Sequence, residues 1–147
     1  MHSSNVESTE QEGNGKHSTE IRVRGYHLDV YGHVNNARYL EFLEEARWRF
    51  FEERGMIDEI TGDELAMVVV NININYRRAA VIHENLKITT QLTRVGGKSF
   101  IVRQEMSLVD TGDMIADMDG TYVLFDNKTG KAMAIEGENK ALLEKLM

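Results

Sequence analysis

A change of periodicity at about residue 65 is the feature of this 147-residue chain that most constrains its fold. Before it, from about Asn36 to Arg54, apolar residues recur at helical spacing and cover more than one side of the predicted helix. After it, residues 70–76 read Val-Asn-Ile-Asn-Ile-Asn-Tyr, the strict alternation of a strand with asparagine on one face. A helix that is apolar on several sides needs a broad cover, and a sheet provides one.

More strands follow, separated by glycine- and aspartate-containing segments that favour turns. Strands are expected at 21–24, 67–76, 86–93, 100–108, 114–125 and 132–135, and a terminal helix at 138–146. Asn35 or Asn36 is a candidate N-cap of the long helix, and Gly55 is a candidate end. The order of one strand, one long helix and a run of antiparallel strands predicts an α+β domain with a curved sheet around a central helix.

Residues 1–19 are rich in Ser, Glu, Gly and Asn, with Met1 and Val6 as the large apolar residues. Such a segment buries too little surface to offset the entropy lost on ordering. We therefore expect a disordered N-terminal extension at 1–19 and one folded domain at 20–147, without internal repeats.

Composition excludes several classes of function. The absence of cysteine excludes disulfides, thiolate nucleophiles and cysteine-based zinc sites. No apolar run approaches the ~18 residues of a membrane span, and the N-terminus lacks a signal-peptide pattern, so a cytoplasmic protein is expected. The net charge of −7 argues against nucleic-acid binding.

One block of the chain is nevertheless basic. Residues 77–103 carry six Lys and Arg side chains against the single acidic residue Glu84. Such a block can bind a compact anion, for example a nucleotide phosphate. Alternatively, these side chains are the solvated faces of strands.

Candidate chemistry lies in residues 26–36, just ahead of the long helix. A helix N-terminus offers unpaired N–H groups and partial positive charge. A carboxylate held there, such as Asp29, can attack a carbonyl or deprotonate water toward it, while the N–H groups stabilise the developing oxyanion. His33 can orient Asp29 or a water, and Asn36 can supply the helix-start N–H. The alternatives are a turn role for Asp29, a histidine satisfied by backbone groups, and simple helix capping by Asn35 and Asn36.

Two other interpretations of these and nearby residues, a metal site and a phosphate loop, have less support. His27, Asp29 and His33 superficially resemble a site with two histidines and one carboxylate, but they match no known ligand spacing, so no metal is expected. Gly96-Gly97-Lys98-Ser99 resembles the end of a phosphate loop, but it lacks the earlier glycine and leads into a strand. The helical glutamates Glu41, Glu44 and Glu45 are either surface ion-pair partners or, for one of them, a second catalytic carboxylate.

The pattern Asp29-x-x-Gly32-His33-Val34-Asn35-Asn36-x-x-Tyr39, followed by Glu44-x-x-Arg47, resembles the 4-hydroxybenzoyl-CoA thioesterase family of the hotdog fold. The resemblance extends from about residue 20 to the C-terminus and is greatest to bacterial long-chain acyl-CoA thioesterases. It implies a long helix wrapped by a curved antiparallel sheet, with active sites formed between two subunits. Residues 79–80 depart from the family, because relatives tend to have proline after the basic pair.

The resemblance also implies roles for individual residues. Asp29 falls on the catalytic aspartate, as nucleophile or general base, and Asn36 falls where a backbone N–H polarises the thioester carbonyl. Arg77, Arg78, Lys98 and Ser99 fall in regions that resemble the CoA-binding surface. The expected partner is an acyl-CoA substrate, with no separate cofactor, and the expected assembly is a homodimer or homotetramer.

Two other functions remain open from the sequence. One is a hotdog hydratase or dehydratase acting on acyl thioesters, which would pair a histidine with a carboxylate. The other is an acyl-CoA-binding sensor, although the acidic N-terminal segment is poorly suited to contact DNA phosphates.

Overall fold

The computed structural model describes residues 6–11, 15–55 and 65–147. Its elements are β1 (Val6–Gln11), β2 (His17–Arg22), a 3-10 turn (Gly25–His27), α1 (Asn36–Glu53), β3 (Leu65–Tyr76), β4 (Asn85–Val95), β5 (Phe100–Leu108), β6 (Met114–Asp126), β7 (Lys131–Met133) and α3 (Gly137–Glu144).

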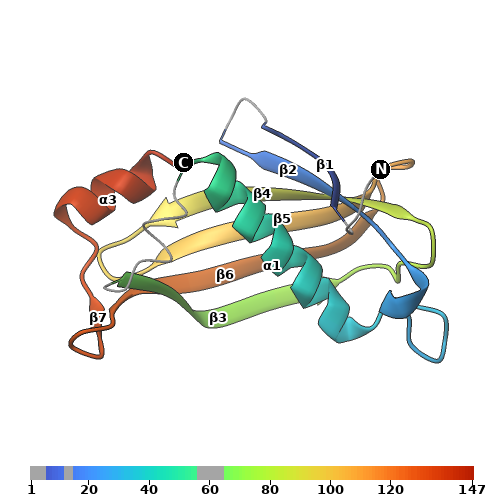
Figure 1. Ribbon diagram of the computed structural model, residues 1–147, viewed down its shortest axis with the longest axis horizontal. Coiled ribbons are helices and arrows are strands. Elements are labelled where there is room, and N and C mark those ends of the chain that lie inside the picture. Colours follow the sequence, from blue (N-terminus) through green and yellow to red (C-terminus); the bar gives the residue numbers. More distant parts are fainter. Residues whose placement is uncertain (1–5, 12–14, 56–64) are drawn as a thin grey trace.

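The strands form one antiparallel sheet in the order β1-β2-β4-β5-β6-β3, and β7 pairs with β6. Figure 1 shows α1 crossing one face of this curved sheet. This is the predicted α+β arrangement of a long helix wrapped by an antiparallel sheet, and the boundaries of β3, β4, β5, β6 and β7 lie within two residues of the predicted ones. β3 is an edge strand, because it pairs with β6 alone among the described strands.

The core lies between α1 and the sheet. Tyr39, Leu43 and Ala46 of α1 pack in one cluster with Ile88 and Met118 of the strands. Toward its C-terminal end the helix packs Phe50 and Phe51 into a second cluster, which continues to α3. One side of the helix is therefore buried along its length, while Leu40 and Trp48 of its broad apolar surface stay exposed.

The ends of α1 follow the predicted signals. The side chain of Asn35 accepts a hydrogen bond from the Ala37 N–H at 3.0 Å, which makes Asn35 the N-cap. Gly55 adopts a φ of +74° just after the helix, and its N–H donates to the Glu52 carbonyl. A positive φ is the conformation for which glycine is selected at helix ends.

The predicted disordered extension at 1–19 is wrong for part of its length. Residues 6–11 form β1, which pairs with β2, and β2 begins at His17 instead of residue 21. His17, Ser18 and Thr19 are buried, because β2 lies under the C-terminal half of α1 and pairs with β4. The sequence did not predict a strand here because these residues are polar, and their burial depends on contacts with residues far away in the sequence. Residues 1–5 and 12–14 of the extension lie outside the described residues.

Within the described part of the chain, no helix is both long enough and apolar enough to span a bilayer.

Candidate active site

The loop between β2 and α1 is fixed at its base by a buried histidine. The His27 ring packs edge-on against Phe42 at 4.8 Å between centroids, and its Nδ1 accepts a hydrogen bond from the Arg24 N–H. The His27 carbonyl accepts from the Asn35 N–H at 2.9 Å. Burial lowers the pKa of His27, so its ring is neutral near pH 7. His27 thus sets the position at which the loop enters α1.

Asp29 sits at the start of a tight turn that holds one of its carboxylate oxygens. The Gly32 N–H donates to the Asp29 carbonyl, and Gly32 has a φ of +77°. Oδ1 of Asp29 accepts hydrogen bonds from the Tyr31 N–H at 2.9 Å and the His33 N–H at 3.3 Å. Among the described residues, Oδ2 has no hydrogen-bond partner. The turn therefore orients the carboxylate and leaves one oxygen available for chemistry.

His33 and Asn36 flank this carboxylate in different ways. His33 contacts Asp29 through backbone groups, and its exposed imidazole makes no hydrogen bond with the described residues. Asn36 is the first residue of α1, so its N–H belongs to the unpaired first turn of the helix. The helix start thus offers a donor beside Asp29.

One cavity of about 280 Å³ brings these groups together. It is lined by Asp29, His33 and Asn36, by Tyr39 and Tyr76, and by Arg77 and Arg78. The three predicted catalytic residues and two of the four predicted CoA-binding residues therefore share one pocket. His27 does not line it, and no three His, Cys, Asp or Glu side chains in the described ranges are grouped to hold a metal ion.

Both arginines of the pocket are held by carboxylates. Nε of Arg77 donates to Oδ2 of Asp117 at 2.8 Å, and the Arg78 guanidinium donates to both carboxylate oxygens of Glu84. The hydrogen bond from Arg77 lowers the pKa of Asp117 against the opposing effect of burial. Burial also opposes ionisation of Glu84, but hydrogen bonds from Arg78 and from the Val81 N–H outweigh it and lower the Glu84 pKa. These pairs fix the arginine side chains and offset part of their charge.

Lys98 and Ser99 are not brought to this pocket within one chain. They lie in the turn between β4 and β5, where the Gly96 N–H donates to the Ser99 carbonyl and the Ile135 N–H donates to the Gly97 carbonyl. Figure 1 places this turn at the end of the sheet away from the start of α1.

Sequence reasoning missed the residues that support the pocket. Asp117 and Glu84 hold the arginines, and the Tyr39 hydroxyl accepts a hydrogen bond from the buried Ala80 N–H at 2.9 Å. Glu84 stood out only as the acidic residue in a basic block. The role of Asp117 could not be recognised from the residues around it in the sequence, because its partners come from neighbouring strands.

The chain is similar to known thioesterases in sequence and in structure. Residues 23–146 match the family model of the thioesterase-like superfamily. The chain is 54% identical to the long-chain acyl-CoA thioesterase FadM of Escherichia coli (strain K12) over 129 residues, which are 88% of this chain and 98% of FadM. The crystal structure of YbaW, a probable thioesterase from Escherichia coli, superposes with a TM-score of 0.82 at 54% identity, covering 88% of this chain and 97% of YbaW.

A second solved structure is a probable thioesterase from Bartonella henselae. It has a TM-score of 0.70 and 30% identity to this chain, with 84% of this chain and 100% of that chain covered.

Proposed function

The chain belongs to the thioesterase-like superfamily, and on this premise we propose that it hydrolyses long-chain acyl-CoA to a free fatty acid and CoA. The observation that carries the proposal is the Asp29 carboxylate, which lies with one free oxygen beside the start of α1 in a pocket shared with two arginines. Identity of 54% over nearly the whole length of a long-chain acyl-CoA thioesterase supports the substrate class.

The chemistry proposed for Asp29 follows from its free oxygen. The thioester carbonyl lies against the Asn36 N–H, which stabilises the oxyanion that forms when the carbonyl is attacked. In the general-base route, Oδ2 removes a proton from water and the hydroxyl adds to the carbonyl. The C–S bond then breaks, and the departing thiolate takes up the proton as CoA thiol.

In the nucleophilic route, Oδ2 itself attacks and displaces CoA thiolate, which leaves a mixed anhydride on Asp29. Water then hydrolyses the anhydride and regenerates the carboxylate. In both routes the proposed role of His33 is to hold Asp29 through its backbone N–H.

A path for the acyl chain runs along α1. Asn36, Leu40, Glu44 and Trp48 form a row at four-residue spacing that winds along α1. The row leads from the Asp29 pocket to a second cavity of about 210 Å³, which lies between α1 and β3. Twelve residues of helix span about 18 Å. An extended chain advances about 3.6 Å per three bonds, so this distance corresponds to about 15 bonds. The cavity is therefore placed to receive the far end of a long acyl chain.

CoA is proposed to bind at the mouth of the Asp29 pocket, with its phosphates on Arg77 and Arg78. Lys98 and Ser99 lie at the other end of the sheet, so they can contact the same CoA only from a second copy of the chain.

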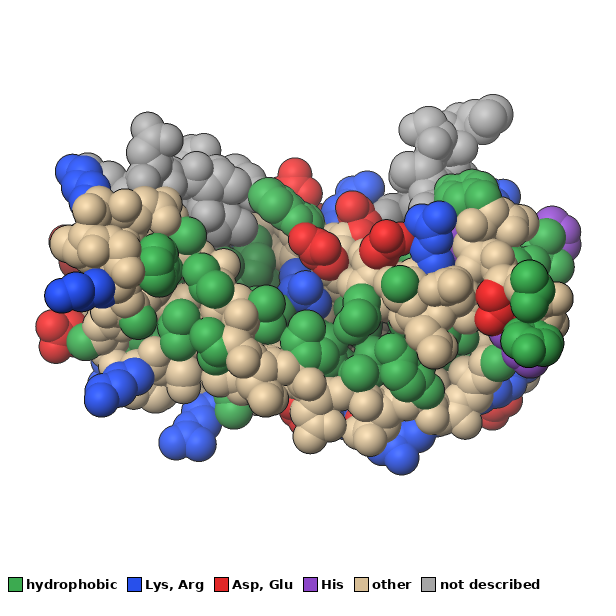
Figure 2. All heavy atoms as spheres, turned by 90° about the horizontal axis from the view of Figure 1, so that it is seen from below, with side chains coloured by type: hydrophobic (Ala, Val, Ile, Leu, Met, Phe, Trp, Pro, Cys, Tyr) green, Lys and Arg blue, Asp and Glu red, His purple; other side chains and the backbone are tan. Residues whose placement is uncertain are grey.

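The β3 edge supports a homo-oligomer. Val68, Val69, Val70 and Ile72 are all exposed on this strand. Figure 2 views the molecule from the β3 side and shows hydrophobic side chains gathered along it. A long apolar edge left open is prone to pair with another chain. We expect at least a homodimer, and light scattering that shows a monomer at micromolar concentration would contradict this expectation.

The decisive experiment compares thiol release from acetyl-, benzoyl-, decanoyl- and palmitoyl-CoA by the wild type, Asp29→Asn and Asp126→Asn. Asp126 is a matched control, because its Oδ1 accepts from the Lys128 and Thr129 N–H groups in a remote turn. We expect activity that rises with chain length, a loss of about 10³-fold or more in Asp29→Asn, and wild-type rates in Asp126→Asn.

Full activity in Asp29→Asn would show that the catalytic group is misplaced. Hydration of crotonyl-CoA without thiol release would indicate a hydratase, and tight binding of palmitoyl-CoA without turnover would indicate a sensor.

A further inference from the structure

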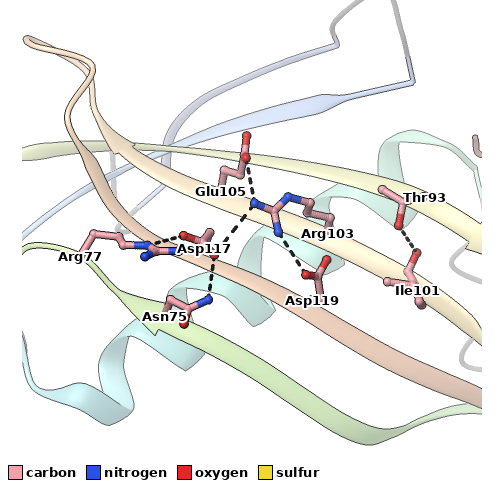
Figure 3. A network of polar contacts seen from close by, with 8 residues as sticks. All are labelled: Asn75, Arg77, Thr93, Ile101, Arg103, Glu105, Asp117 and Asp119. Carbon is pink, nitrogen blue, oxygen red and sulfur yellow. Dashed lines mark hydrogen bonds and ion pairs between the residues drawn. The ribbon is translucent and has the colours of Figure 1, made fainter.

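Asp117 lies on the face of the sheet opposite α1, yet it is only 6% exposed. It belongs to a network of polar contacts that joins β3, β5 and β6 and includes Arg77, Arg103 and Asp119 (Figure 3). Carboxylates are seldom this well covered unless they are paired. Keeping the surface soluble does not require a carboxylate to be covered in this way, so we looked for another role of the network.

The register of the sheet explains why the partners meet at Asp117. Asn75 of β3 and Glu105 of β5 lie directly opposite Asp117 on the neighbouring strands. Arg77 lies two positions after Asn75, just past the end of β3, and Arg103 lies two positions before Glu105. Both are therefore diagonal neighbours of Asp117, within reach of long side chains. Nδ2 of Asn75 donates to Oδ1 of Asp117 at 3.1 Å, and a guanidinium nitrogen of Arg103 lies 3.9 Å from Oδ1.

Arg77 is the member of this network that also reaches the Asp29 pocket. Its backbone is fixed, because its N–H donates to the Ile115 carbonyl at 2.7 Å. Its side chain is half exposed and bonds Asp117 through Nε. No described residue bonds the Nη1–Nη2 edge of the guanidinium, and this planar pair of donors matches two oxygens of a phosphate.

We infer that Asp117, held by Asn75, is a positioning residue that fixes the Arg77 guanidinium for a phosphate of the CoA moiety. The inference rests on the proposed function for the identity of the ligand. A free arginine side chain would have to be ordered when the ligand binds, and a side chain that is already fixed avoids this cost. Asp117 therefore acts on affinity for the phosphorylated part of the substrate and does not touch the reacting carbonyl.

Asp117→Asn is the sharpest perturbation, because it keeps the size of the side chain. The Asp117 carboxylate accepts from two donors, Asn75 Nδ2 and Arg77 Nε, whereas an asparagine has a single acceptor oxygen. The substitution also removes the negative charge that pairs with the Arg77 guanidinium. Asp119→Asn is the matched control, since Asp119 lies on the same strand and bonds Arg103, but has no contact with Arg77.

The experiment measures the Kd of CoA by calorimetry, and the KM and kcat for palmitoyl-CoA and for palmitoyl-pantetheine, which carries no phosphate. For Asp117→Asn we expect the Kd of CoA and the KM of palmitoyl-CoA to rise about tenfold, equivalent to about 1.4 kcal/mol. The kcat and the KM of palmitoyl-pantetheine should stay within about twofold, and Asp119→Asn should match the wild type in every constant.

A double-mutant comparison separates positioning from a structural role. Asp117→Asn should have no further effect on the Kd of CoA in an Arg77→Gln background. An additional increase there, an unchanged Kd in Asp117→Asn, or equal losses with palmitoyl-pantetheine would overturn the inference. Failure of the wild type to bind CoA would overturn it too, whereas CoA binding that depends on Asp117 without hydrolysis would refute only the proposed function.

If Asp117→Asn does not fold, Asn75→Ala tests the same point by removing the other support of the carboxylate. A smaller increase in the Kd of CoA, about threefold, supports the inference, and no increase refutes it.

Discussion

The hydroxyl of Tyr39 connects α1 to the segment that follows β3, and its removal gives a stability change that can be worked out from the structure. The hydroxyl accepts a hydrogen bond from the Ala80 N–H at 2.9 Å, and both residues are buried. The Ala80 carbonyl in turn accepts from the Val34 N–H in the loop before α1. The segment that carries the pocket arginines is thus held at Ala80 by both α1 and the loop that carries Asp29.

Tyr39→Phe keeps the ring, including its edge contact with Tyr76 at 5.4 Å between centroids. It leaves the Ala80 N–H, in a residue with 0% exposure, without an acceptor. A buried donor that loses its partner costs about 1–3 kcal/mol. With an m-value of about 1–3 kcal/mol/M in urea, the unfolding midpoint should fall by about 1 M while m stays constant.

Tyr76→Phe is the matched control. Its hydroxyl lies 3.5 Å from the Asn36 carbonyl and its side chain is exposed, so water can replace the contact. We expect a change below about 0.5 kcal/mol. Both variants must be unfolded at one protein concentration, because association shifts apparent stability. Equal stability of Tyr39→Phe and the wild type would show that the Ala80 N–H finds another acceptor, and the reasoning would be refuted.

Two further changes test the packing and the buried histidines. In Gly120→Ala, the new Cβ would lie 2.9 Å from Cε1 of Tyr122, whose ring stacks on Phe100 and cannot easily move. Urea unfolding should show a loss of about 1–3 kcal/mol, and a much smaller loss in a Tyr122→Leu background; equal losses in both backgrounds would contradict the clash. Burial lowers the pKa of His17 and His27, so the unfolded chain binds protons more readily, and stability should decline as pH falls below about 6.5. His27→Asn should reduce this decline, because asparagine can accept the Arg24 N–H without titrating, and a pH dependence as steep as that of the wild type would argue against His27.

Much of the fold was predictable because its signals are local. The period of the apolar residues separates α1 from the strands, and Asn35 and Gly55 mark the helix ends by their own backbone chemistry. The start of β2 was predicted wrongly because the signals that define it are not local. His17–Thr19 read as a polar extension, and only pairing with β4 and packing under α1 bury them.

In the candidate site, too, some features follow from the local sequence and others depend on the tertiary structure. Asp29, Gly32 and Asn36 lie within a few residues of one another, so the turn and the helix start that align them can be read along the chain. Arg77 and Arg78 were recognised as basic residues, but their proximity to Asp29 depends on β3 ending beside the start of α1. Lys98 and Ser99 belong to the same basic block and lie at the opposite end of the sheet.

The sequence by itself determined the long helix, the antiparallel strands and the carboxylate turn at the start of α1, because each depends on torsional preference and periodicity over a few residues. Only the tertiary structure decided which carboxylates hold the arginines. Asp117 reaches Arg77 across 40 residues of chain through the register of β6 with β3, and the Ala80 N–H meets the Tyr39 hydroxyl across 41. Such contacts follow from how a sheet closes around a helix, which no local pattern records.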